Sequence, residues 1–149
     1  MILLSRRSLL AIAAVVDIAL HARPNPVAAK SLASRHDLPP RHLETMLQAL
    51  VRCGILKGVR GPRGGYELAM ERRRITAGDI VRAAMNSTGE DSMPPVPVST
   101  LVSDVIGPTV ERAGRSFLEK LDAVTVEDLC RQATEKKAAE IPAAADFTI

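Results

Sequence analysis

The feature that most constrains the fold is a change of hydrophobic period at Gly54. Before Gly54, apolar residues recur every three or four positions through residues 40–53, the spacing of an amphipathic helix. After it, residues 55–59 and 66–68 read as two short strands around a tip at residues 60–65 that is rich in arginine and glycine. The sequence therefore predicts a helix followed directly by a basic β-hairpin.

The residues before this helix predict a second, shorter helix. Pro24-Asn25-Pro26 ends an earlier helical segment, because proline lacks a backbone donor and restricts the residue before it. We expect a short helix over residues 27–36, a tight turn over residues 37–40 and Pro40 at the first position of the next helix. A helix-turn-helix followed by a hairpin is a winged helix-turn-helix, so the predicted fold class is mainly α with a small β-hairpin wing.

The opening segment SRRSLLAIAAVVDIALHA allows two interpretations. Two arginines before an apolar run, with Val27-Ala28-Ala29 as a cleavage site, resemble a twin-arginine export signal at residues 5–29. Its apolar residues instead recur at helical spacing, with Arg7, Asp17 and His21 on the opposite face. The periodicity favours a first amphipathic helix with Leu9, Ile12, Ala13, Val16, Ala19 and Leu20 facing inward.

The second half of the chain predicts further helices. Thr76 to Asp79 form a capping-box pattern at a helix start, and the polar, proline-rich residues 86–97 are typical of a linker. A longer helix follows, in which Gly107-Pro108 indicates either a kink or the start of a second helix. A second capping box at Thr125 to Asp128 opens a last short helix. The predicted organisation is a DNA-binding domain at 1–85, the linker at 86–97, two helices within 98–135 and a flexible tail at 136–149.

Charge divides the chain in two. Residues 1–74 carry thirteen Lys and Arg against five Asp and Glu, whereas residues 75–149 carry seven against twelve. A basic half of this kind suggests a polyanionic partner. With only Tyr66, Phe117 and Phe147 as aromatics, the chain lacks the stacking platforms that single-stranded RNA needs.

No pattern in the sequence predicts an enzyme or a metal site. His21, His36 and His42 are not spaced as metal ligands, and neither a nucleophile elbow nor a P-loop occurs. The two cysteines, Cys53 and Cys130, are far apart and predict no disulfide framework.

The runs VRCGILKGVRGPRGGYELA at residues 51–69 and ITAGDI at residues 75–80 resemble the Rrf2 family of bacterial winged-helix regulators. The likeness extends from about Arg7 to Asp128. It implies a transcriptional regulator, a homodimer held by a long helix near residues 98–122, and a palindromic operator. It also places the opening segment at the family's first helix, which implies a cytoplasmic protein without a membrane partner rather than an exported one.

Two sets of residues are predicted to carry this function. The dimer interface is expected to use the apolar residues of the long helix, namely Val102, Ile106, Val110, Ala113, Phe117 and Leu121. Base or phosphate contacts are expected from the outer face of helix 40–53, the hairpin tip and nearby basic or hydroxyl residues. These are Arg41, His42, Glu44, Thr45, Gln48, Arg60, Arg63, Gly64, Gly65, Lys30, Ser31 and Arg7, with Arg72-Arg73-Arg74 either extending the basic face or merely solvated.

The chain departs from the members of this family that bind an iron-sulfur cluster. Those members carry three closely spaced cysteines before the dimer helix, and residues 86–104 contain none. We therefore expect a repressor without a cluster or other cofactor, controlled by an effector that the sequence does not identify. A thiol-based regulator that senses oxidation through Cys53 is the alternative.

Overall fold

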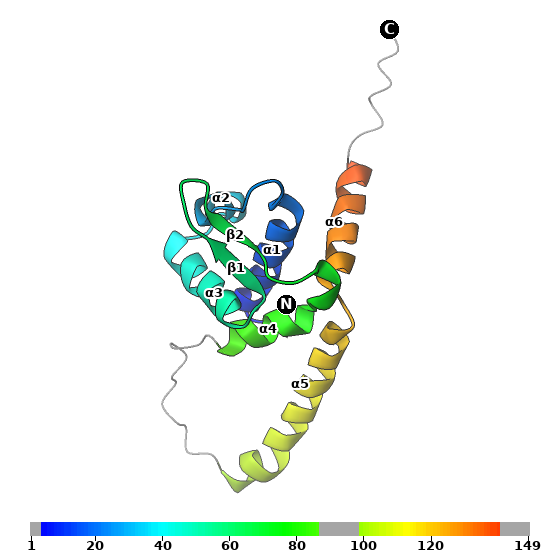
Figure 1. The fold of residues 1–149 in the computed structure, drawn as a ribbon. Helices are drawn as coiled ribbons and strands as arrows, with labels where there is room; N and C mark the ends of the chain where they lie inside the picture. Colours follow the sequence, from blue (N-terminus) through cyan, green and yellow to red (C-terminus); the bar gives the residue numbers. More distant parts are fainter. Residues whose placement is uncertain (1–3, 87–98, 141–149) are drawn as a thin grey trace.

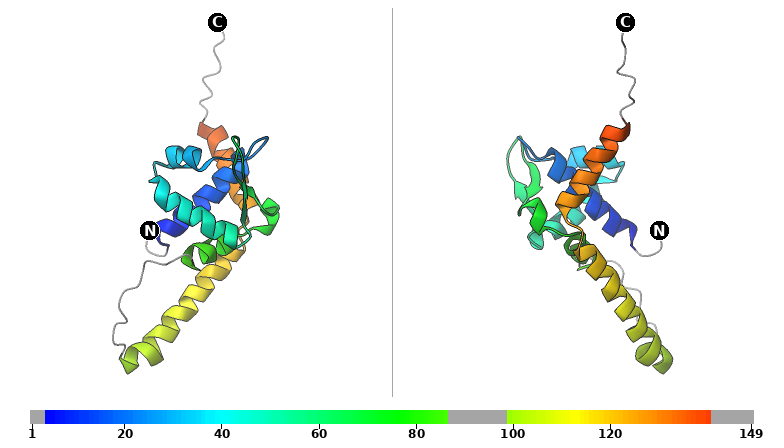
Figure 2. Two further views of the ribbon diagram at one scale, coloured as in Figure 1. Left: turned by 60° about the vertical axis from the view of Figure 1, so that its left-hand side comes forward. Right: turned by 90° about the vertical axis from the view of Figure 1, so that its right-hand side faces the viewer.

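The computed structural model describes residues 4–86 and 99–140 (Figure 1). The elements follow one another as α1 (Arg6–His21), α2 (Ala29–His36), α3 (Pro40–Arg52), β1 (Leu56–Val59), β2 (Gly65–Leu68), η1 (Arg72–Arg74), α4 (Ala77–Asn86), η2 (Val102–Ile106), α5 (Gly107–Asp122) and α6 (Val126–Glu140). We call residues 4–86 together with α6 the body, and η2 with α5 the arm. Two further views show the arm projecting away from the body (Figure 2).

The helix-turn-helix forms as the sequence predicts. Asp37 ends α2 in the left-handed conformation at φ 50°, and Pro40 occupies the first turn of α3. Gly54 follows α3 with φ 74°, a conformation that glycine adopts without a Cβ penalty. Val27, Leu32 and Ala33 are buried, as expected for the inward residues of the short helix segment.

The wing is an antiparallel hairpin in which Leu56 pairs with Leu68 and Val59 with Gly65. Val27 pairs with β2 through an isolated antiparallel bridge. Its N–H donates to the Tyr66 carbonyl at 2.9 Å, and its carbonyl accepts from the Tyr66 N–H at 2.8 Å. A Cβ on Gly65 would lie 2.4 Å from the Val27 carbonyl oxygen, so only glycine allows this approach. The wing is thus fixed to the segment that leads into α2.

The opening segment forms α1, and its core residues are only in part the ones predicted. Of the six residues expected to face inward, Ala19 is buried, Ile12 and Val16 are partly buried against the core, and Leu20 is exposed. The buried face instead carries Ala11, Val15 and Ile18. The prediction was only partly right because α1 contacts α3, α4, α6 and β2, so apolar residues occur almost all round it and the period does not select one face.

The arm is a single helical run. The backbone stays right-handed helical through Ile106 and Gly107, so of the two alternatives left open by the sequence, the start of a second helix at Pro108 is excluded. Residues 102–106 instead form a π turn, in which the Gly107 N–H bonds the Val102 carbonyl five residues earlier. The wider turn allows the helix to continue past a residue that has no N–H.

The last helix is longer than predicted and belongs to the body. α6 runs through Glu140, so residues 136–140 are helical rather than part of a loose tail. Its capping box forms, with the Asp128 N–H bonding Thr125 Oγ1 at 3.1 Å. Val126 and Cys130 are buried in the same core as α1 and α4, because α6 contacts α1 and η1.

A short bridge joins the two halves of the chain. Ala77 N–H bonds the Val124 carbonyl and Val126 N–H bonds the Ile75 carbonyl, both at 2.8 Å. The capping box that opens α4 also forms between Thr76 and Asp79, as predicted. The predicted linker at 86–97 lies outside the described residues except for Asn86, which ends α4. In the described ranges, no helix is long and apolar enough to cross a membrane.

Candidate nucleic-acid interface

One side of α3 is entirely exposed and polar. The opposite side supplies the core residues Leu43, Met46, Leu47 and Leu50, all of which are buried as predicted. All five α3 residues predicted to contact DNA are exposed on the outer side, namely Arg41, His42, Glu44, Thr45 and Gln48. Because the core anchors the inner side, this polar surface is presented on a rigid helix.

Two hydrogen bonds order the outer side of α3. Thr45 Oγ1 donates to the Arg41 carbonyl at 3.2 Å, which leaves the hydroxyl oxygen free to accept. Gln48 Nε2 donates to the Tyr66 hydroxyl at 3.4 Å and so connects α3 to β2. The wing and α3 therefore share a polar contact at the surface that both present.

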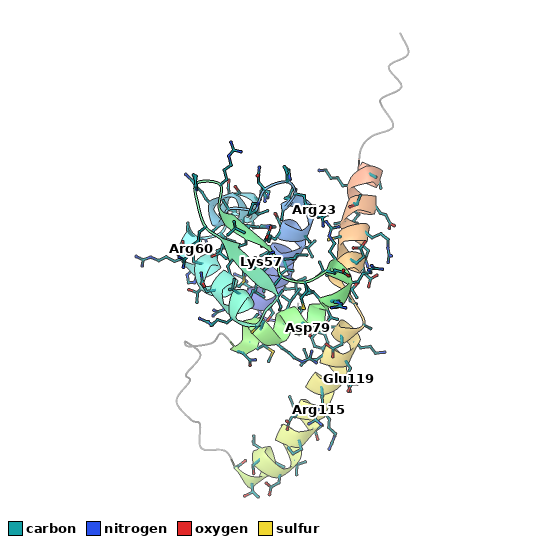
Figure 3. All side chains as sticks on the ribbon, in the orientation of Figure 1. Arg23, Lys57, Arg60, Asp79, Arg115 and Glu119 are labelled. Carbon is teal, nitrogen blue, oxygen red and sulfur yellow. The ribbon has the colours of Figure 1, made fainter. Side chains whose placement is uncertain are left out.

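The hairpin tip carries the two arginines predicted for the wing. Arg60 and Arg63 are both exposed, and Figure 3 shows Arg60 at the hairpin side of the body, remote from Arg115 on α5. Gly61 has φ 117°, and a Cβ on Gly64 would lie 2.3 Å from the Val59 carbonyl oxygen. The glycines predicted as contact residues thus have a backbone reason to be present that requires no ligand.

The remaining predicted contact residues lie on neighbouring helices. Lys30 and Ser31 are exposed in the first turn of α2, and Arg7 is half-buried in the first turn of α1. Arg72 does not extend the basic face, because its guanidinium donates to the Ala19 carbonyl at the end of α1. Arg73 and Arg74 are exposed.

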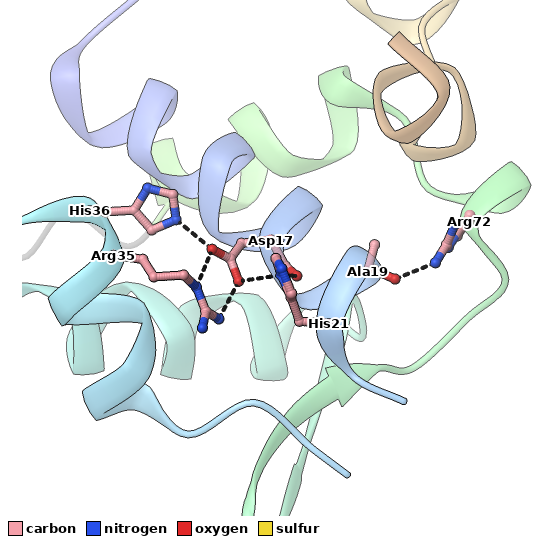
Figure 4. Close-up of polar contacts among 6 residues, drawn as sticks. All are labelled: Asp17, Ala19, His21, Arg35, His36 and Arg72. Atoms are coloured by element: carbon pink, nitrogen blue, oxygen red, sulfur yellow. Dashed lines mark hydrogen bonds and ion pairs between the residues drawn. The ribbon is translucent and has the colours of Figure 1, made fainter. Parts of the chain in front are cut away.

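A buried carboxylate joins α1 to α2, and sequence reasoning placed it on an outward face (Figure 4). Asp17 is only 7% exposed and accepts from Arg35 through Nε at 2.9 Å and Nη2 at 2.6 Å. His36 Nε2 lies 2.9 Å from Asp17 Oδ2, and His21 Nδ1 lies 3.2 Å from Oδ1. No sequence motif indicates this cluster, because its members come from two helices and meet only after folding.

The environment of Asp17 lowers its pKa. Burial raises the pKa of the carboxyl group, but the hydrogen bonds from Arg35 and His36 and the charge of Arg35 outweigh burial. Asp17 is therefore ionised in the folded protein and orients the last turn of α2, immediately before the turn into α3.

The arm exposes an apolar stripe. Val102, Ile106 and Val110, which the sequence predicts at a dimer interface, are exposed, and Leu101 and Val105, which that prediction did not include, are 60% and 56% exposed. The exposed apolar residues of the stripe recur every three to five positions through the π turn. This extended pattern could have identified Leu101 and Val105 from the sequence.

The other three predicted interface residues differ from one another in exposure. Ala113 is exposed, whereas Phe117 and Leu121 are half-buried near the body, where Phe117 lines a hollow with Val81 of α4. An ion pair holds this end of the arm, since Nη1 and Nη2 of Arg82 donate to the two carboxylate oxygens of Asp122, at 2.6 and 2.8 Å.

The cysteines do not form a set of iron ligands. Cys53 is exposed at the end of α3, while Cys130 is buried in α6, where burial raises the pKa of its thiol. Within residues 4–86 and 99–140, no group of three His, Cys, Asp or Glu side chains could hold a metal ion. The residues described therefore do not fit an iron-sulfur cluster, which thiolates usually ligate.

A helix-turn-helix with an exposed polar second helix and a basic wing defines the winged-helix class of DNA-binding proteins. The model of the Rrf2 family, described as an iron-dependent transcriptional regulator, matches residues 4–132. The chain belongs to the Rrf2 family, and it is a DNA-binding transcriptional regulator rather than an enzyme.

Solved structures and curated proteins agree with this assignment. An IscR structure from T. potens has a TM-score of 0.69 and 34% identity, covering 89% of each chain. The structure of CymR, the global cysteine regulator of B. subtilis, has a TM-score of 0.67 and 30% identity over 89% of this chain and 98% of that one. The protein slr0846 of Synechocystis sp., provisionally named an HTH-type transcriptional regulator, is 32% identical over 92% of this chain and 93% of its own length.

Proposed function

We propose that this regulator acts in the cytoplasm as a homodimer that represses transcription by binding a palindromic operator without an iron-sulfur cluster. The observation that carries the proposal is the pairing of two exposed surfaces in one protomer. One is the polar face of α3 with its basic wing, and the other is the apolar stripe of the arm.

In this proposal, α3 enters the major groove with its N-terminal half. Arg41 is suited to guanine, Glu44 to the amino group of cytosine and Gln48 to adenine, while His42 and Thr45 contact bases or phosphates. Arg60 and Arg63 approach the minor groove, where the negative potential favours arginine. Lys30, Ser31 and Arg7 hold the backbone phosphates and so fix the register of the helix on the duplex.

The arm supplies the twofold symmetry. Contiguous exposed apolar side chains are unfavourable on a monomer, and a second copy offers the same stripe in return. Two protomers joined in this way would present their α3 helices to successive major grooves, roughly 34 Å apart or a multiple of that. A palindromic operator is the sequence that such a dimer reads.

The proposal that no iron-sulfur cluster is bound depends on which cysteines are available as ligands. Residues 86–104 contain no cysteine, Cys130 is enclosed in the body, and Cys53 stands alone at the end of α3. An effector other than a cluster would then control the population of the DNA-competent dimer. Repression follows if the bound dimer blocks access to a promoter.

Selection of duplexes from a random DNA library by the purified protein tests this function. We expect enrichment of a palindrome whose half-sites are centred about one helical turn, or a multiple of it, apart. Enrichment of a single unrepeated half-site would contradict the homodimer. The absence of any enriched sequence, with only salt-dependent binding to all duplexes, would contradict specific recognition.

A further inference from the structure

A cavity of about 210 Å³ lies beside the face of α3 that we assign to DNA. It is bounded by the first turns of α1, the turn between α2 and α3, and the first half of α3. Its lining consists of Arg7, Leu10, Leu38, His42, Leu43, Thr45 and Met46. Two of these residues, His42 and Thr45, are also exposed on the outer face of α3.

The lining divides into an apolar part and a set of polar groups. Leu43 and Met46 are buried, and Leu10 and Leu38 are partly buried against the same core. Arg7 and His42 are the basic groups of the lining, and in the described part of the chain no ion pair engages either one. No acidic side chain lines the cavity.

Size and charge together define what the cavity accepts. A dry apolar cavity of roughly 150 Å³ holds a benzene molecule, so this one has room for a ligand with an apolar group of that size and a small polar head group. A guanidinium without a carboxylate partner binds a carboxylate through paired N–H donors. Small-molecule sites combine an apolar lining with a few polar groups in this way.

We propose that this cavity is an effector site for a small monocarboxylate. The apolar group of this ligand lies against Leu10, Leu38 and Met46, and its carboxylate contacts Arg7 and His42. The regulatory part of this proposal rests on the proposed function, because His42, Thr45 and Arg7 are also assigned to the operator. A ligand carboxylate and an operator phosphate then compete for the same side chains. The ligand lowers DNA affinity, and DNA lowers ligand affinity by the same factor.

Benzoate is the probe for the site, and benzyl alcohol is its matched control, with the same ring and no charge. Titration of the full chain without DNA, followed by NMR, should give saturable shifts at the lining residues with benzoate. Benzyl alcohol should bind about tenfold more weakly, the loss expected from one charge-assisted hydrogen bond. Equal affinities for the two probes would overturn the assignment of a carboxylate, and shifts that do not saturate would overturn the site.

Two variants locate the binding. Arg7→Gln should weaken benzoate about tenfold and leave benzyl alcohol unchanged. Leu10→Phe should fill the cavity and abolish binding of both probes, whereas Leu20→Phe, at an exposed position of the same helix, should not. Unchanged benzoate affinity in Leu10→Phe, in a variant with wild-type circular dichroism, would overturn the site.

The regulatory part is tested with the selected duplex. Saturating benzoate should weaken binding of that duplex about tenfold, and the duplex should weaken benzoate by the same factor. An unchanged DNA affinity would overturn the regulatory role. If the protein prefers no duplex, the proposed function fails, and the titration without DNA still decides whether the cavity binds a carboxylate.

Discussion

The body buries its apolar side chains within one protomer, whereas the arm leaves its apolar side chains exposed. Leu32, Leu47, Leu50 and Ile80 of the body have no exposed surface. In α5 no residue is buried, and the stripe from Leu101 to Val110 is 40–63% exposed at its apolar positions. Both regions are helices with apolar residues at similar spacing, so the difference lies in what covers those residues.

This difference indicates that contacts within one protomer stabilise the body, whereas the arm depends on contacts outside the protomer. The body is complete, since α6 returns from the end of the arm and closes the core with Val126 and Cys130. The arm is fixed to the body at one end, through the Arg82–Asp122 pair and the half-buried Phe117. Its far end gains a covered surface only from a partner, and we infer that the partner is a second copy.

A matched pair of leucines gives the largest expected effect. Leu47→Ala removes a fully buried side chain from the body and should lower the free energy of unfolding by about 2–5 kcal/mol. Leu101→Ala in the arm should cost less than about 0.5 kcal/mol at concentrations where the chain is monomeric. Urea denaturation measures both, and equal losses would break the comparison between body and arm.

A charge placed in the stripe should separate the protomers. Val105→Asp puts a carboxylate at the centre of the exposed apolar positions and should weaken the dimer by about 2 kcal/mol or more, roughly thirtyfold. Sedimentation equilibrium measures the dissociation constant, and Glu111→Asp is the control on the same helix. The circular dichroism of the body should not change. An unaltered dissociation constant would remove the stripe from the interface.

The Asp17 cluster should make the stability of the body depend on acid. Because folding lowers the pKa of Asp17, its contribution is present above the ordinary value of 3.8 and is lost as the pH falls through the lowered pKa. Asp17→Asn should cost about 1–2 kcal/mol at neutral pH, since Arg35 is partly exposed and its pairing is screened.

The control for this prediction is Glu119→Gln, which removes an exposed carboxylate on the arm, remote from Asp17. Urea titrations across acidic pH should give a flatter stability curve for Asp17→Asn than for the wild-type protein. A curve that keeps its slope would mean that Asp17 does not carry the linkage.

Removal of a wing charge should weaken binding to every duplex. Arg60→Ala should lower affinity and reduce the slope of the logarithm of the binding constant against that of salt by about 1. Arg115→Ala on the arm is the matched control, because it removes an exposed arginine far from the wing (Figure 3). If both variants keep the wild-type slope, Arg60 makes no phosphate contact.

Removal of a base-reading group should have the smallest effect on affinity. Glu44→Ala should reduce discrimination at one base pair of each half-site by about 1–3 kcal/mol while changing non-specific binding little. Competition between the selected duplex and single-base variants of it measures this. A uniform loss across all duplexes would assign Glu44 a structural role instead.

The body could largely be predicted from the sequence because its signals are local. Prolines, the glycine after α3 and the two capping boxes fix where helices begin and end. The hairpin is equally local, since its turn residues determine the pairing. The exposure of the α3 residues that we expect to contact DNA could be predicted directly from the helical period.

The rest depends on contacts between distant segments. The burial of Asp17 requires the last turn of α2, and the role of Arg72 requires the end of α1. The π turn before Gly107 and the return of α6 to the body likewise depend on the arrangement of whole helices. A periodicity identifies a helix but does not say which neighbours surround it, which is why the buried face of α1 was predicted only in part.

The measurement that bears most directly on the central claim is the mass of the protein–DNA complex in sedimentation, with the selected duplex and the wild-type or Val105→Asp chain. We predict two wild-type chains on each duplex, assembled cooperatively, and loss of that complex in the variant at the same concentration. One wild-type chain per duplex, or an undiminished two-chain complex with Val105→Asp, would contradict the account.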